Sequence, residues 1–263
     1  MKRAFLTLAT ALLTTATLFS QEPTVQDTDT YVTDSLELYQ QRKNILKLSL
    51  TSLAFRNFQF SYERVLNKTF SASISYSFIP EGNVPFEGLI SNLADDEDFD
   101  DILDSSSFSY NSFTLELRIY TKGHGRGLYF APFYRNANYD IKDVPYEFTS
   151  DEGTSEEIDA SGEIKTNTFG LLIGTQFKLG NRLVLDWWIL GPHIGTSSGN
   201  VLATSNESLS INEQNSLRNE LEDIFLDIDL IDTEVEVDAN SANVIVDGPW
   251  AGLRAGFSLG YRF

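Results

Sequence analysis

The sequence contains two histidines, His124 and His193, and histidine is the side chain best suited to act as a general base at neutral pH. A hydrolase also needs a nucleophile within hydrogen-bond reach of that base and a third group that orients it. His124 lies in the glycine-rich segment 122–126, which is typical of a solvent-exposed turn. His193 is followed closely by Ser197 and Ser198, so it is the one candidate for hydrolytic chemistry. The absence of cysteine excludes a cysteine nucleophile, disulfide bridges and zinc knuckles.

A second candidate chemistry is cation binding by the acid-rich segment 95–101. Carboxylate oxygens suit a hard cation such as calcium. The segment lacks the glycine and the spaced ligands of an EF-hand loop, so a solvated acidic segment is the favoured interpretation. We therefore predict no metal site and no cofactor, and weak calcium binding is the alternative. Its candidate ligands are Asp95, Asp96, Asp98 and Asp100.

A third group consists of charged side chains at alternate positions of otherwise apolar or hydroxyl-bearing segments. Its members are Lys47, Glu63, Glu116, Arg118, Arg135, Asp186 and Arg254. Alternate positions of a strand share one face, and charges buried on such a face persist only when they are paired. Three acids and four bases therefore predict an ionic network inside the fold. Such a network would either gate a narrow pathway or act as a structural plug.

The elements that must position these side chains are strands, because apolar and polar residues alternate with a period of two. The segment 70–78 shows the pattern most clearly, since its apolar residues are separated by four serines. Eight such segments are predicted, at 46–51, 58–63, 70–78, 113–119, 128–136, 169–177, 183–189 and 253–263. The fold class is therefore all-β.

Short and long connections alternate between the predicted strands. The short turns are 66–69, 121–127 and 179–182, and the long loops are 80–107, 139–166 and 196–249. This asymmetry, the even strand count and the strand lengths predict an eight-stranded antiparallel transmembrane up-and-down β-barrel over residues 44–263. The N-terminal segment 21–43 and both chain ends would lie in the periplasm. Because eight strands leave no continuous channel, we favour the plug over the gated pathway.

The first 20 residues are predicted to be a signal peptide. Lys2 and Arg3 form a positive start, and residues 4–19 carry no charge. The polarity changes abruptly after Ser20, where we expect cleavage. A membrane helix is disfavoured because threonines interrupt the apolar stretch.

The chain ends on a strand with apolar or aromatic residues at alternate positions, namely Phe257, Leu259, Tyr261 and Phe263. This ending resembles the C-terminal signal of outer-membrane barrels, which the barrel-assembly machinery reads. With the signal peptide and the alternating strands, the chain resembles the OmpA-like and OmpX-like barrel superfamily, without the peptidoglycan-binding domain. The resemblance implies a Gram-negative outer membrane, with its lipids and lipopolysaccharide as surroundings. The resemblance also suggests a comparison with the lipid A deacylases. The chain does not have the His-x-Ser spacing of those enzymes, because residue 195 is glycine.

The longest predicted loop contains signals of local structure. Ser210 and Glu213 form a capping box, and Leu217 and Leu221 begin an apolar stripe, which predicts an amphipathic helix at about 211–229. A second apolar stripe follows Pro85 in the loop 80–107. We expect these stripes to pack on the barrel rim and on each other rather than to bind a partner. Four valines predict a hairpin above the membrane, at positions 235, 237, 244 and 246.

Charge is distributed unevenly over the predicted molecule. The three long loops hold 9, 9 and 12 of the 38 acidic residues, whereas the short turns hold four bases and no acid. The formal net charge of −19 argues against a nucleic-acid partner. We predict a non-enzymatic outer-membrane barrel whose extracellular loops have a structural, adhesion or partner-binding role. The alternatives are a lipid-modifying enzyme that uses His193 and a narrow gated pore.

Overall fold

The computed structural model describes residues 39–83, 105–149, 155–204, 208–226 and 232–263. The predicted signal peptide, the calcium candidates at 95–100 and the apolar stripe after Pro85 lie outside these residues. The chain divides into two units, Met1–Gln41 and Arg42–Phe263, and every described strand belongs to the second.

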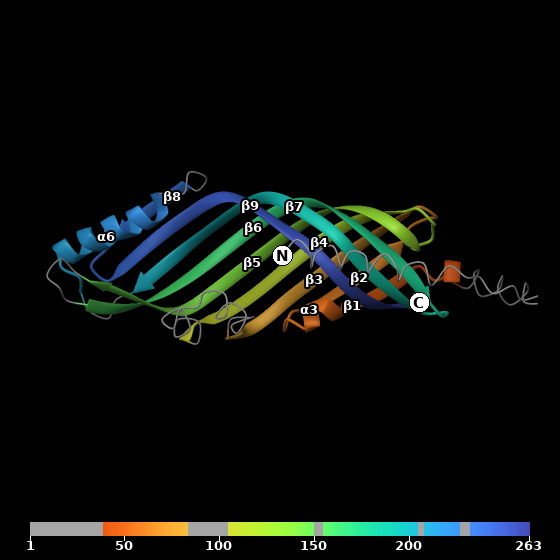
Figure 1. Cartoon of the computed structure of the whole chain (residues 1–263), viewed down its shortest axis with the longest axis horizontal. Coiled ribbons are helices and arrows are strands. Elements are labelled where there is room, and N and C mark those ends of the chain that lie inside the picture. Colours follow the sequence, from red (N-terminus) through yellow and green to blue (C-terminus); the bar gives the residue numbers. More distant parts are fainter. Residues whose placement is uncertain (1–38, 84–104, 150–154, 205–207, 227–231) are drawn as a thin grey trace, which may run out of the picture. The chain divides into compact units, whose positions relative to one another are not determined.

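The second unit is built almost entirely from strands, as the sequence predicts (Figure 1). The strands are β1 (Asn44–Ser49), β2 (Phe58–Val65), β3 (Phe70–Asn83), β4 (Ser107–Tyr120), β5 (Gly127–Thr149), β6 (Ser155–Leu179), β7 (Leu183–Thr204), β8 (Asp232–Val237) and β9 (Ser241–Arg262). Two helices that the argument uses are α3 (Leu50–Leu53) and α6 (Ile211–Leu226). No helix in the described part of the chain is long and apolar enough to cross a membrane.

Eight of these strands form a closed antiparallel ring. Each strand pairs with its neighbour in the order β1-β2-β3-β4-β5-β6-β7-β9, and β9 pairs back to β1 from Ile45↔Arg262 to Ser49↔Ser258. The predicted set of eight antiparallel strands is therefore present. The strand β8 is an addition outside the ring, because it pairs only with β9.

The ring has an apolar outer face, and its inner face is polar apart from a buried cluster that includes Phe133, Leu172 and Trp188. On β3 the four serines at alternate positions 71–77 are 0–4% exposed, whereas Ile74 and Tyr76 are 41% and 50% exposed. Serine fits the narrow interior because it is small, and its hydroxyl finds partners there, as in the 2.8 Å hydrogen bond from Ser75 to Ser61. The period-two pattern of the sequence is thus the pattern of inward and outward side chains.

The first strand begins and ends two residues earlier than predicted, at Asn44–Ser49 instead of 46–51. The alternation of leucines continues to Leu50, but β1 ends at Ser49 and the helical turn α3 follows. Ser49 caps this turn, because its side chain accepts a hydrogen bond from the backbone N–H of Ser52 at 3.2 Å. The local capping contact therefore replaces the last strand pairs, and Thr51 Oγ1 instead accepts the backbone N–H of Phe257 on β9 at 2.8 Å.

The strands β5, β6, β7 and β9 run much further than predicted. The expected loop 139–166 is mostly strand, since β5 continues to Thr149 and β6 begins at Ser155. The expected loop 196–249 is reduced in the same way to the residues between Thr204 and Ser241. Backbone pairing supports these extensions, because the strands remain paired although their side chains are mostly polar, with one register shift between Ile141 and Val144 in the β5 extension.

The segment between β7 and β9 folds as a small unit of its own. The capping box is formed, with Ser210 N donating to Glu213 at 2.7 Å and Glu213 N donating to Ser210 Oγ at 3.3 Å. Leu217 is 1% exposed in an apolar cluster with Val237 and Ala242, and Leu221 packs beside it. The helix α6 therefore lays its apolar stripe on the predicted β8–β9 hairpin.

Candidate functional site

The inner face of the ring gathers charged side chains from five strands. The structure brings together six of the seven residues predicted for the ionic network, namely Lys47, Glu63, Glu116, Arg118, Asp186 and Arg254. Each lies at an inward position of β1, β2, β4, β7 or β9 and is at most 6% exposed. Directly bonded residues of this cluster lie up to 139 positions apart in sequence.

Lys47 joins three strands to β1. Its Nζ donates to Glu63 at 2.5 Å, to Asp186 at 2.6 Å and to the side-chain carbonyl of Gln176 at 2.5 Å. An ammonium group has three hydrogens, so these three acceptors satisfy it completely.

Arg118 occupies the centre of the same cluster. Its guanidinium donates to Glu116 at 2.6 and 2.8 Å, to Asp186 at 2.6 Å and to Glu63 at 3.2 Å. All four side chains are fully buried in these ion pairs. Buried charges are tolerated only with such complete pairing, so the arrangement accounts for their presence inside the ring.

Arg254 forms the edge of the cluster. It donates to Glu116 at 3.0 Å, and its guanidinium carbon lies 4.7 Å from the ring centre of Phe133 and 5.2 Å from that of Trp188. With Arg254, the cluster contains three bases and three acids and is formally neutral.

Besides Gln176, four further uncharged residues complete the network, and the charge pattern of the sequence did not indicate any of the five. Tyr120 and Ser71 donate to Glu63 at 2.8 and 2.6 Å, and Tyr129 and Trp188 donate to Asp186 at 2.8 and 3.2 Å. The available signal was their inward register, which they share with the charged residues. A search limited to charge misses them because a buried carboxylate takes hydrogen bonds from neutral donors as well.

Arg135 does not join the cluster, which corrects the prediction. It is half-buried on β5 and donates a hydrogen bond to the hydroxyl of Tyr110. Arg135 pairs across β4 with Thr114, one inward position beyond Glu116, so it lies past the reach of the carboxylates. The sequence indicates that Arg135 faces inward, but it does not indicate how far along the axis of the ring Arg135 lies from the carboxylates.

Among the described residues, no nucleophilic side chain is hydrogen-bonded to His193, the residue on which the catalytic alternative depends. His193 is 7% exposed and its ring meets that of Phe133 edge-on at 5.9 Å. No serine hydroxyl in the described part of the chain is hydrogen-bonded to it, and Ser197 donates to the carbonyl of Gly248 at 3.2 Å. Ser197 is therefore hydrogen-bonded to the backbone and not to His193.

The four residues of the predicted C-terminal assembly signal all face outward. Phe257, Leu259, Tyr261 and Phe263 are 43%, 38%, 41% and 46% exposed. Phe257 stacks on Trp187 of β7 with ring centres 5.6 Å apart. These side chains form one outward-facing row along β9 and its end.

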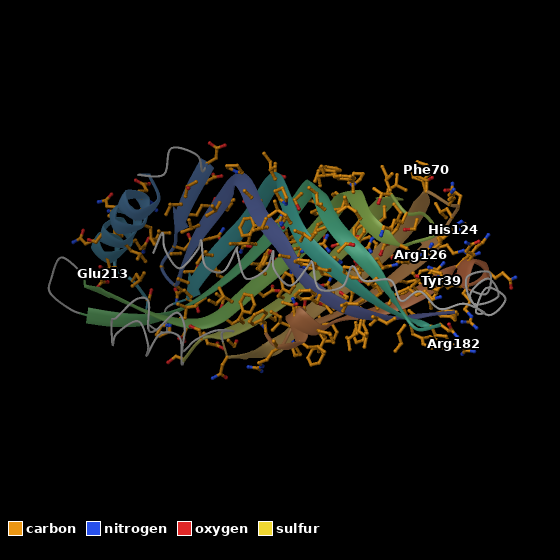
Figure 2. The ribbon with its side chains drawn as sticks, turned by 45° about the vertical axis from the view of Figure 1, so that its right-hand side comes forward. Tyr39, Phe70, His124, Arg126, Arg182 and Glu213 are labelled. Atoms are coloured by element: carbon orange, nitrogen blue, oxygen red, sulfur yellow. The ribbon has the colours of Figure 1, made fainter. Side chains whose placement is uncertain are left out.

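The two ends of the ring differ in charge. His124, Arg126 and Arg182 lie at one end, and Glu213 of α6 lies at the other (Figure 2). Partial burial lowers the pKa of His124, and the nearby cations Arg126, Arg262 and others lower it further. The end that carries the short turns therefore has a positive electrostatic field.

No known protein family matches the sequence, and no curated protein matches it either. Among solved structures, the chain is similar to the crystal structure of Acinetobacter baumannii CarO2. The two share 12% identity at a TM-score of 0.33, over 80% of this chain and 98% of that chain. These comparisons do not assign the chain to a family.

Proposed function

We propose that this protein is a membrane-spanning β-barrel of a Gram-negative outer membrane and that it has a non-enzymatic role. The observation that carries the proposal is the reversed distribution of polarity around the closed ring. On β4, Phe113, Leu115 and Leu117 are 36%, 46% and 43% exposed. Their neighbours on the inner face, Thr114, Glu116 and Arg118, are 2%, 4% and 0% exposed.

A water-soluble fold has the opposite distribution, because a large contiguous apolar surface is costly in water. The outward row on β4 continues on β9 with Leu253, Phe257 and Leu259 and on β2 with Phe58 and Phe60. Lipid is the environment in which such a band is favourable. The closed strand ring also suits lipid, because it pairs backbone groups that lipid cannot solvate.

The neutral ionic network supports a closed interior. The side chains of Lys47, Glu63, Arg118 and Asp186 have no solvent exposure, and they meet across the ring. The barrel of the proposal is therefore plugged at this level rather than open as a pore. This supports a structural or binding role over transport.

The part that binds a partner is, in this proposal, the acidic end. There β5, β6, β7 and β9 continue beyond the apolar band and α6 packs on the β8–β9 hairpin. The described strands and helix of this end carry many acidic side chains, among them Asp140, Glu163, Glu213 and Glu236. A basic or cation-bridged partner fits it by charge.

The location is tested by separating the membranes of cells that express the protein and by comparing its gel mobility with and without heating. A folded outer-membrane barrel fractionates with the outer membrane and changes mobility on heating. Recovery of the folded chain in a soluble fraction would contradict the proposal.

The binding role is tested by replacing residues 205–240 with a short turn. We expect the shortened chain to insert normally and to lose a partner that the full chain retains in pull-downs from purified outer membranes. A matched control is Asn212→Ala, which alters the surface of α6 and leaves the segment in place. Identical partners for the full and shortened chains would contradict a binding role for this end.

A further inference from the structure

A pocket of about 400 Å³ opens at the basic end of the ring, between the start of β5 and the end of β6. Three of its lining residues are cationic, namely Lys122 and Arg126 from the β4–β5 turn and Lys178 from β6. None of the described residues that line it is acidic. The positive charge of these three side chains favours an anion as the ligand.

The rest of the pocket is largely apolar. Leu128 and Phe177 line it and are 38% and 46% exposed on the outer face of the ring. They belong to the apolar band that the proposed function places in lipid. The pocket therefore joins a cationic part at the end of the ring to an apolar part that continues along its wall.

The shape of the pocket depends on a turn with an unusual backbone. Gly123, Gly125 and Gly127 have φ values of 79°, 71° and 79°, and His124 has a φ of 54°. A side chain on Gly127 would lie 2.7 Å from Cγ of Lys122, so the missing side chain makes room for the lysine stem.

Several hydrogen bonds hold this turn in place, and two of them lie beside the pocket. Gln176 Nε2 donates to the carbonyl of Gly125 at 2.7 Å, and the backbone N–H of Thr121 donates to the carbonyl of Leu128 at 2.9 Å. Gln176 is also bonded to Lys47, so the turn is tied to the interior network. The cations are thus presented by a fixed scaffold, which lowers the cost of ordering them around a ligand.

We propose that this pocket binds the phosphate headgroup of an anionic phospholipid in the periplasmic leaflet, with an acyl chain along Leu128 and Phe177. The inference rests on the proposed membrane location and adds a specific lipid class to it. The charge selects an anion and the apolar wall selects a lipid over a small soluble anion. A zwitterionic phospholipid fits the wall but brings no net negative charge to the cationic part of the pocket.

The test is native mass spectrometry of the detergent-extracted chain, mixed with equal amounts of phosphatidylglycerol and phosphatidylcholine of the same acyl composition. We expect retention of phosphatidylglycerol over phosphatidylcholine. In the double variant Lys122→Gln/Lys178→Gln, the preference should fall by roughly 25-fold, since each cation near an anionic lipid contributes about fivefold. The matched control Lys68→Gln/Arg182→Gln removes two cations from the other turns of the same end and should leave the preference unchanged.

Three results would overturn the inference: equal retention of both lipids, an equal loss in the control variant, or full displacement of the lipid by inorganic phosphate at the same concentration. The last result would identify a site for small anions instead. Each sample is first checked for its heat-dependent gel mobility. A chain that never folds into membranes contradicts the proposed function, whereas a folded chain without lipid preference contradicts only this inference.

Discussion

At the scale of single residues, Asp186 connects four elements of the interior. It accepts hydrogen bonds from Lys47 on β1, Arg118 on β4, Tyr129 on β5 and Trp188 on its own strand. The carboxylate thereby partly neutralises the charges of two buried cations, Lys47 and Arg118. Removal of one charge from such a cluster is costly, because the remaining charges stay buried without a counter-charge.

We therefore expect Asp186→Asn to destabilise the folded strand ring by about 3–5 kcal/mol. The measurement is urea unfolding of the refolded chain in lipid vesicles, followed by tryptophan fluorescence. The control is Glu81→Gln, which breaks the 2.8 Å surface pair with Lys142, and it should cost no more than about 1 kcal/mol. Equal effects of the two variants would contradict the account of the network.

The pKa of His124 reports the electrostatic field at the basic end of the ring. Its folded-state pKa is lowered, first by partial burial and then by the surrounding cations. The folded protein therefore binds the proton less readily than the unfolded chain, so this residue's contribution to stability decreases as the pH falls through the unfolded-state pKa of about 6.5. We expect a proton NMR titration of His124, in a His193→Gln background, to give a pKa below that value. A titration at or above it would contradict the positive field.

At the scale of elements, the junction of β1 and α3 shows how local and tertiary contacts compete. Sequence alternation favours a strand through Thr51, whereas the Ser49 cap favours a helical turn after β1. The turn replaces strand pairing at one point of the ring wall. Thr51 compensates for the missing strand pair, because its hydroxyl accepts a hydrogen bond from the backbone N–H of Phe257. Phe257 follows Gly256, whose φ is 150°.

We expect Thr51→Val to destabilise the strand ring by about 1–3 kcal/mol, because it leaves that N–H without its acceptor. Thr51→Ser keeps the hydroxyl and should behave like the unchanged chain within about 0.5 kcal/mol. Urea unfolding in vesicles measures both. If valine and serine prove equivalent, the hydroxyl has no such role.

At the scale of the whole molecule, charge and topology agree on an orientation. The short turns join strands at the basic end, and the longer strand extensions and α6 form the acidic end. In the proposed membrane location, the acidic end faces outward and the basic end faces the periplasm. The natural sequence has no cysteine, so a single introduced thiol reports its own side without interference.

We expect Asn212→Cys on α6 to react with a membrane-impermeable maleimide on intact cells and Lys68→Cys in the β2–β3 turn to react only after the outer membrane is permeabilised. Comparable labelling of both in lysed cells is the control. Labelling of position 68 alone on intact cells would reverse the orientation.

Much of this architecture could be predicted from the sequence. Period-two alternation identifies the strands and their inward residues, because successive side chains of a strand point to opposite faces. The capping box identifies the start of α6 in the same way, since its hydrogen bonds link residues three positions apart. These features depend on neighbours in the chain, and such neighbours are visible in the sequence.

Which side chains meet inside the ring depends on the stagger between strands, and only the tertiary structure determines that stagger. Lys47, Asp186 and Arg118 meet because of their heights in the ring, while Arg135 shares their inward direction and lies too far along β5. Backbone pairing, which is insensitive to side-chain pattern, likewise extended β5 and β6 through a segment that resembled a loop. Sequence periodicity therefore determined which way each side chain points, and strand register determined which side chains meet.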